Sequence, residues 1–199
     1  SNTQVMTIVG GVPTWSTPAA GGGSLVNFTE QKSTASPNAT VPVVSLKATS
    51  TEANIDAALT PKGTGALLAH MPTATTAGGS KRGNYAVDLQ LSRDSAGKVA
   101  SGSYAVITGG QSNTASQTLT VVCGGTTNSA VGSTSAILGG SNNSAGGTYS
   151  SIVGGQQNNA NGLASFVGGG EINTAGGADS VVCGGGNNLA NGVYSASLG

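Results

Sequence analysis

The sequence predicts an all-β, fibrous protein in three parts: an extended N-terminal arm (1–40), a small β connector (41–82) and a parallel β-solenoid (83–199). Gly supplies 34 of the 199 residues, well above its usual share of about 7%, and Gly disfavours helices. Only 7% of the residues are charged, whereas a disordered chain needs high charge. From residue 103 onward, the sequence repeats every 15 residues, which is too short for a pair of helices.

Residues 1–40 are rich in Gly, Ser, Thr and Pro. Such a segment cannot form a packed core alone, so we expect an extended arm that attaches the protein to a partner. Val12, Pro13 and Trp15 are the candidate docking residues, because Trp15 is the only Trp in the chain and Trp is enriched at interface hot spots.

Residues 41–82 contain β-prone runs at 41–48 and 55–59, followed by the turn signal Pro61-Lys62-Gly63. This pattern indicates a small β connector between the arm and the repeats.

Six complete units cover residues 103–192, and a seventh begins at Val193. Its incompleteness at Gly199 suggests that the repeat continues. If Ser103 is position 1, every complete unit has Gly at positions 7 and 8, Asn at position 11 and Ala at position 13. In the first four units these are Gly109, Gly110, Asn113 and Ala115; Gly124, Gly125, Asn128 and Ala130; Gly139, Gly140, Asn143 and Ala145; and Gly154, Gly155, Asn158 and Ala160.

Each unit reads as one coil of a solenoid. Apolar residues at positions 4 and 5 predict a short strand, and Gly-Gly and Asn predict the corners. The Ile/Val column at position 5 is expected inside, with the Ala column at position 13 where opposite walls approach. The Asn column is expected to form a ladder between coils. An irregular coil, 83–102, has four extra residues, which we assign to a loop near residues 92–98.

A coil of this size buries little apolar surface, so a single thin solenoid would be marginally stable. A second apolar column at position 4 includes Val106, Val121, Phe166 and Val181. Because neighbouring positions of a strand point in opposite directions, we expect one column to face another chain. The sequence therefore predicts a homotrimer around one axis.

The order of Ser, Val or Ile, Gly-Gly, Asn, Ala and Gly in these units resembles the head repeats of trimeric autotransporter adhesins, although their usual period is 14. It is more similar to Gly/Asn-rich repeats of bacteriophage tail fibres. Residues 59–68, 83–90 and 9–16 also resemble segments of phage fibres. This resemblance implies a virion structural protein, the proximal part of a trimeric tail fibre. Its arm would bind tail or other virion proteins, and a distal region would bind a host receptor outside the cell.

Three other binding or structural functions fit the pattern less well. A capsid-mounted fibre would use the same design. A bacterial surface adhesin would need a secretion signal and a membrane anchor, and the sequence shows neither. An ice- or mineral-binding solenoid would need a flat face of Thr, whereas position 3 is mostly Ser.

The sequence predicts no catalytic residue, cofactor or metal site. His70 has no neighbouring nucleophile or carboxylate at a catalytic spacing, and Cys123 and Cys183 are four coils apart. Glu171 and Asp179 are the one pair considered for a polysaccharide-degrading tailspike, but both are expected at exposed corners. Seven basic residues balance seven acidic ones, which argues against nucleic-acid binding. No apolar run reaches the roughly 18 residues of a membrane span.

Overall fold

The computed structural model of the chain describes residues 5–9, 12–16, 28–33, 43–48 and 59–199. Within these residues all regular elements are β-strands and there is no helix, which confirms the all-β prediction. The chain divides into two compact units, Ser1–Ala58 and Leu59–Gly199.

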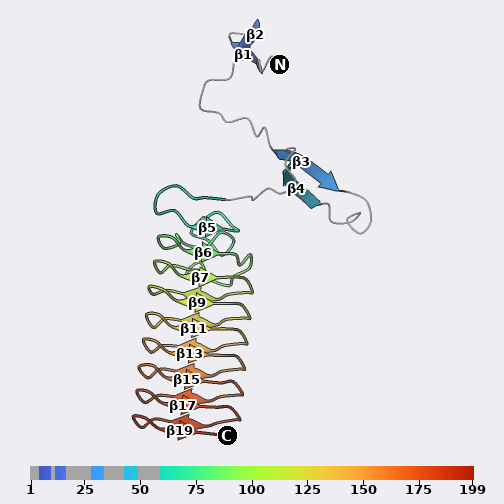
Figure 1. Ribbon diagram of the computed structural model, residues 1–199. Helices are drawn as coiled ribbons and strands as arrows, with labels where there is room; N and C mark the ends of the chain where they lie inside the picture. Colours follow the sequence, from blue (N-terminus) through green and yellow to red (C-terminus); the bar gives the residue numbers. More distant parts are fainter. Residues whose placement is uncertain (1–4, 10–11, 17–27, 34–42, 49–58) are drawn as a thin grey trace. The chain divides into compact units, whose positions relative to one another are not determined.

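The N-terminal unit contains two antiparallel strand pairs (Figure 1). Strand β1 (Val5–Val9) pairs with β2 (Val12–Ser16), and β3 (Phe28–Ser33) pairs with β4 (Val43–Ala48). Strands β1, β2 and β3 fall within residues 1–40, and their backbone groups find partners by pairing. The extended attachment arm that the sequence indicates there stays a prediction. Strand β4 lies within the predicted strand at 41–48. Of the other predicted strand, residues 55–58 lie outside the described part of the chain.

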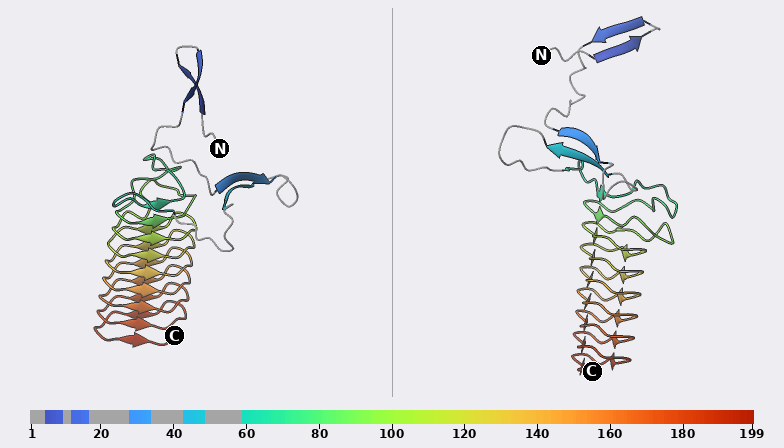
Figure 2. Two further views of the ribbon diagram at one scale, coloured as in Figure 1. Left: turned by 45° about the horizontal axis from the view of Figure 1, so that its top comes forward. Right: turned by 90° about the vertical axis from the view of Figure 1, so that its right-hand side faces the viewer.

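The second unit is a parallel β-solenoid, as predicted (Figures 1 and 2). One long sheet joins nine two-residue strands in register, each paired with the next coil. These strands are β5 (Leu67–Leu68), β6 (Val87–Asp88), β7 (Val106–Ile107), β9 (Val121–Val122), β11 (Ala136–Ile137), β13 (Ser151–Ile152), β15 (Phe166–Val167), β17 (Val181–Val182) and β19 (Ala196–Ser197).

A second parallel sheet of six strands lies on the other side of the coils (Figure 2). It consists of β8 (Thr114–Ala115), β10 (Ser129–Ala130), β12 (Ser144–Ala145), β14 (Asn159–Ala160), β16 (Thr174–Ala175) and β18 (Leu189–Ala190). Single parallel bridges at position 9, from Ser92 to Gly186, form a third contact between successive coils. Each regular coil is thus held to its neighbour along three lines.

The long sheet begins upstream of residue 83, where the sequence placed the first coil. Strand β5 pairs with β6, so residues from Leu67 onward already belong to the solenoid. The extra residues of coil 83–102 lie between the bridges Ser92↔Gln111 and Ala100↔Ala115. This is the loop at 92–98 that the sequence indicated.

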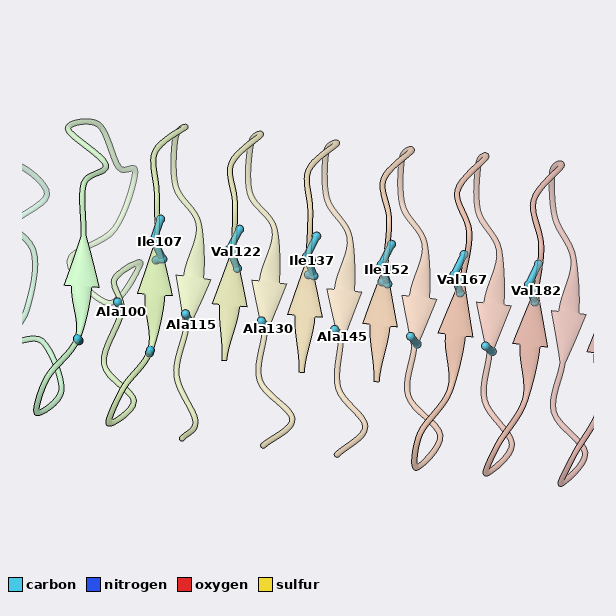
Figure 3. Packing of buried hydrophobic residues seen from close by; sticks show 14 of the residues in the cluster. Ala100, Ile107, Ala115, Val122, Ala130, Ile137, Ala145, Ile152, Val167 and Val182 are labelled. Carbon is cyan, nitrogen blue, oxygen red and sulfur yellow. The ribbon is translucent and has the colours of Figure 1, made fainter. Parts of the chain in front are cut away.

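The core is a thin layer between the two sheets (Figure 3). Ile or Val at position 5 has no exposed surface in any regular coil, and Ala at position 13 is equally buried except at Ala190. Ile107 packs in the same layer as Ala115, and this pairing of a large with a small side chain recurs along the rod. The predicted interior columns are therefore confirmed.

The corners depend on left-handed backbone at positions 2, 8 and 10. Position 8 is always Gly, but positions 2 and 10 carry side chains as large as Tyr149 and Ile172. The left-handed residue turns its N–H toward the preceding coil: the Thr134 N–H donates to the Thr118 carbonyl (2.9 Å). By contrast, the strand residue Val121 donates to Ser135 of the following coil (2.9 Å). Each interface between two coils therefore contains backbone hydrogen bonds donated in both directions.

Candidate functional site

The Asn residues at position 11 connect successive coils through side chain to backbone hydrogen bonds. The Asn128 Oδ1 accepts the Asn143 N–H of the next coil (3.0 Å). Its Nδ2 donates to the Gly124 carbonyl in its own coil (3.0 Å) and to the Gly140 carbonyl in the next (2.9 Å). The expected ladder is present, although its bonds are to backbone groups of its own coil and the next. All three bonds are buried or half-buried, where an unmade bond is costly.

The two glycines of each pair have different surroundings. The second Gly has φ between +80° and +85°, and a Cβ on Gly140 would lie 2.1 Å from the Gly155 carbonyl oxygen. A Cβ on the first Gly, Gly139, would meet nothing within 4 Å. The same open space is found at Gly109 and Gly154. The fold of one chain therefore requires Gly at position 8. At position 7, Gly124 and Gly169 have positive φ values of 159° and 143°, but at Gly109, Gly139, Gly154 and Gly184 neither the backbone nor the surrounding space requires Gly.

The outer surface of the long sheet is mainly apolar, whereas that of the six-stranded sheet is mainly polar. At the corners, exposed side chains such as Tyr104, Leu119 and Tyr149 are mixed with polar ones. On the long sheet, position 4 is half-buried and position 6 is mostly exposed. We call these two columns the apolar face; they comprise Val87, Leu89, Val106, Thr108, Val121, Cys123, Ala136, Leu138, Ser151, Val153, Phe166, Gly168, Val181, Cys183, Ala196 and Leu198. Ser, Thr, Asn and Gly dominate the corresponding columns of the six-stranded sheet. The apolar face carries no ionisable group other than its two cysteine thiols.

Several large side chains of the apolar face are open to solvent. Leu138 is 54% exposed and Val153 is 45% exposed. Both cysteines, Cys123 and Cys183, are free and exposed on this face. Contiguous exposed apolar surface is a common feature of interaction sites in soluble proteins, so this face is a candidate site. The glycines at position 7 directly follow position 6 in each coil, so the edge of the apolar face next to them carries no side chains.

The irregular coil replaces the Asn ladder with one Gln side chain. The Gln90 Oε1 accepts the Asn113 N–H (2.9 Å), as Asn Oδ1 does between later coils. The Gln90 Nε2 donates to the carbonyls of Lys98 (2.7 Å) and Asn113 (3.0 Å). Gln90 therefore starts the ladder. The repeat pattern does not indicate this role, because Gln90 stands where the repeat has Gly.

A buried ion pair interrupts the apolar core column. Asp88 occupies position 5, and its carboxylate accepts from the Arg82 Nε at 2.7 Å, with both side chains at most 1% exposed. Arg93 is also buried and donates to backbone carbonyls, including that of Gln90 (2.9 Å). Burial is the main cause that lowers the pKa of Arg93, and the positive charge of Arg82 lowers it further. The negative charge of Asp88 acts in the opposite direction and raises this pKa. Asp88 at an Ile/Val position was the sequence signal for this cluster.

The residues considered for catalysis do not form a recognisable site. Glu171 is exposed in the line of bridges at position 9, and Asp179 is exposed at the left-handed corner of the next coil. His70 is exposed and its Nδ1 contacts the Ala77 carbonyl. Position 3, the column considered for ice binding, is buried at Thr120, Ser135 and the corresponding residues of other regular coils. That column cannot serve as a binding face.

The candidate docking residues Val12, Pro13 and Trp15 all lie in β2, opposite Val9, Ile8 and Met6 of β1. Across the described residues, no group of three or more His, Cys, Asp or Glu side chains could hold a metal ion. Nor does any helix in that part of the chain have the length and hydropathy needed to cross a membrane.

A comparison with protein-family models finds no matching family, and a comparison with curated proteins finds no matching relative.

Proposed function

We propose that this chain is a structural component of a phage virion, the proximal part of a trimeric tail fibre. The observation that carries the proposal is the apolar face, which runs along the long sheet from coil to coil while the six-stranded sheet is mainly polar. Three solenoids that turn this face toward a common axis would bury Leu138, Val153 and their neighbours. The polar sheet and corners would then face solvent.

The glycines at position 7 support the same arrangement. Glycine is the residue that allows another backbone to approach closely, and nothing in the chain itself fills the space beside Gly139. A neighbouring chain packed along the apolar face would occupy that space. The function follows from this architecture: a stiff rod holds a distal tip away from the particle, and several fibres raise avidity.

The mass of the full chain in solution tests the trimer. We expect about three times 19.0 kDa by sedimentation equilibrium. The double variant Leu138→Lys/Val153→Lys should dissociate the assembly, because charges on a buried apolar face are costly. The matched control, Val131→Lys/Asn161→Lys, places the same charges on exposed residues beside the six-stranded sheet and should keep the parental mass. A folded wild-type monomer would contradict the proposal.

The location of the protein, on a phage tail, a capsid or a bacterial surface, needs a separate experiment. Antibodies against the purified chain should label the tails of phage particles that package its gene, as seen by electron microscopy. Label on the capsid would instead support a head fibre, and label on bacterial surfaces would support an adhesin. Either result would overturn the tail-fibre assignment while leaving the trimer intact.

A further inference from the structure

A cavity of about 380 Å³ lies at the start of the solenoid. Its volume falls in the range of about 300–1,000 Å³ that is usual for small-molecule sites. Its polar lining includes Lys62, Thr64, Lys81, Arg82 and Asn84. Two segments line it, one that runs through β5, from Lys62 to Pro72, and one that leads into β6, from Lys81 to Asn84. The Tyr85 N–H joins the two segments by donating to the Thr64 carbonyl (3.0 Å). The walls of the cavity are thus joined by the same kind of backbone hydrogen bond that joins successive coils.

Positive charge is concentrated around this cavity. All five Lys and Arg residues of the unit 59–199 fall between Lys62 and Lys98, and the acidic residues in that span are Asp88 and Asp94. The regular coils from residue 103 onward contain no Lys or Arg. Lys62 and Lys81 are exposed at the cavity, where their ammonium groups can reach a ligand.

The buried charges beside the cavity do not balance. Arg82 and Arg93 are both buried, and Asp88 is the buried carboxylate available to them within residues 59–199. Asp88 pairs with Arg82, while Arg93 is held by carbonyl groups. Two buried guanidinium groups with one carboxylate leave an excess positive charge, which is expensive to keep away from water without a counterion.

Arg82 also has an unused donor group. Its Nε and Nη1 bind the Asp88 carboxylate and the carbonyls of Gly78 and Ser80. Its Nη2 is buried and has no hydrogen-bond partner in the structure. A buried donor without an acceptor costs about 1–3 kcal/mol. An anion in the adjoining cavity would be attracted by this excess of buried positive charge together with the two exposed lysines.

We propose that this cavity binds the carboxylate or phosphate group of a small polar molecule of sugar size. The lysines would contact the anionic oxygens, and the buried cluster of Arg82, Arg93 and Asp88 would add its net positive charge. Thr64 and Asn84 would offer hydrogen bonds to hydroxyl groups. The proposal does not depend on the trimer or on the virion assignment, because every residue named comes from one chain.

The test is calorimetric titration of the full chain with four probes at constant ionic strength: glucuronate, glucose 6-phosphate, glucose and inorganic phosphate. We expect binding of glucuronate or glucose 6-phosphate, with a matching rise in Tm, and no binding of glucose. Equal binding of glucose would overturn the role of charge. Binding confined to inorganic phosphate would overturn the assigned ligand size, and no binding of any probe would overturn the site.

Substitutions at the exposed lysines test the location without disturbing the buried pair. Lys62→Gln/Lys81→Gln should weaken binding by about tenfold or more, since charge-assisted hydrogen bonds are worth about 1.5–3 kcal/mol each. Lys98→Gln, outside the cavity lining, is the matched control and should bind as the parent does. An equal loss in the control would show general attraction by positive charge and would overturn the assignment of the site.

Discussion

The regular coils 103–192 and the irregular region 59–102 solve the same stacking problem with different chemistry. In the regular coils, apolar side chains fill position 5, and Asn side chains at position 11 connect the coils. In the irregular region, Asp88 occupies the core column and Gln90 replaces the Asn. In the regular coils each stabilising interaction is therefore repeated by equivalent residues of many coils. The irregular region depends on a few residues that have no equivalents.

The largest difference between the two regions should appear at the core column. Asp88→Ala leaves Arg82 buried without its carboxylate, and we expect a loss of about 3–5 kcal/mol in the free energy of unfolding. Ile137→Val at the same position of a regular coil should cost about 0.5–1.5 kcal/mol. Urea unfolding, followed by circular dichroism, measures both.

A double variant separates the pair from its surroundings. Arg82→Met/Asp88→Leu replaces the ion pair with apolar side chains and should recover most of the loss, because such replacements are often neutral or stabilising. A double variant that is no more stable than Asp88→Ala would show that hydrogen bonds to the backbone carry the stability instead. These are the bonds of Arg82 to Gly78 and Ser80 and those of the Asp88 carboxylate to the Gln90 and Ala100 N–H groups.

Within the regular coils, the two glycines of one pair should respond differently. Gly140→Ala places a Cβ against the Gly155 carbonyl at a positive φ, so we expect a loss of about 2–4 kcal/mol. Gly139→Ala meets open space in its own chain and should leave the stability of an isolated chain almost unchanged.

The measurement for this pair is thermal unfolding at several protein concentrations. If Gly139→Ala lowers Tm more as the protein is diluted, the added methyl group weakens an assembly. Equal losses for the two variants at every concentration would contradict the distinction between the positions.

The smallest expected effect is a gain in stability. Ile172 is held at a φ of +57°, and left-handed backbone costs a side chain about 1–2 kcal/mol, whereas Asn tolerates it. Ile172→Asn should therefore raise the free energy of unfolding by up to about 1 kcal/mol. Asn already occupies this position at Asn142 and Asn187. The control Ile172→Val retains branching at Cβ and should give no gain, and a gain equal to that of Asn would refute the backbone explanation.

The sequence was sufficient to predict the regular coil because stacked coils need the same type of residue at the same position of each unit. Ile or Val at position 5, Ala at position 13 and Asn at position 11 recur in every unit, so their roles can be inferred from the period alone. The first Gly of the pair recurs too, yet in four of the six units neither its φ nor its surroundings within one chain require Gly. Periodicity identifies a constrained position but does not identify the constraint.

The features that the sequence did not reveal occur once or depend on tertiary context. Left-handed residues such as Tyr149 and Ile172 were missed because propensity alone argues against such a conformation for large side chains. The Arg82–Asp88 pair was missed because Arg82 belongs to no column and Asp88 places a charge in a column that is otherwise apolar. The pairing of β1 with β2 was missed because the Gly and Pro content outweighed the two β-prone runs on either side of Gly10-Gly11, a pattern that favours a hairpin.

The hydrogen bonds between coils run along the axis of the rod, in both directions at each interface. A pulling force along the solenoid would therefore act on the interfaces in series, so every interface would bear the full force. Additional copies of the 15-residue unit extend the reach of the rod but cannot raise the force at which it breaks. That force is fixed by the weakest interface, so the uniformity of the repeats is itself a mechanical property.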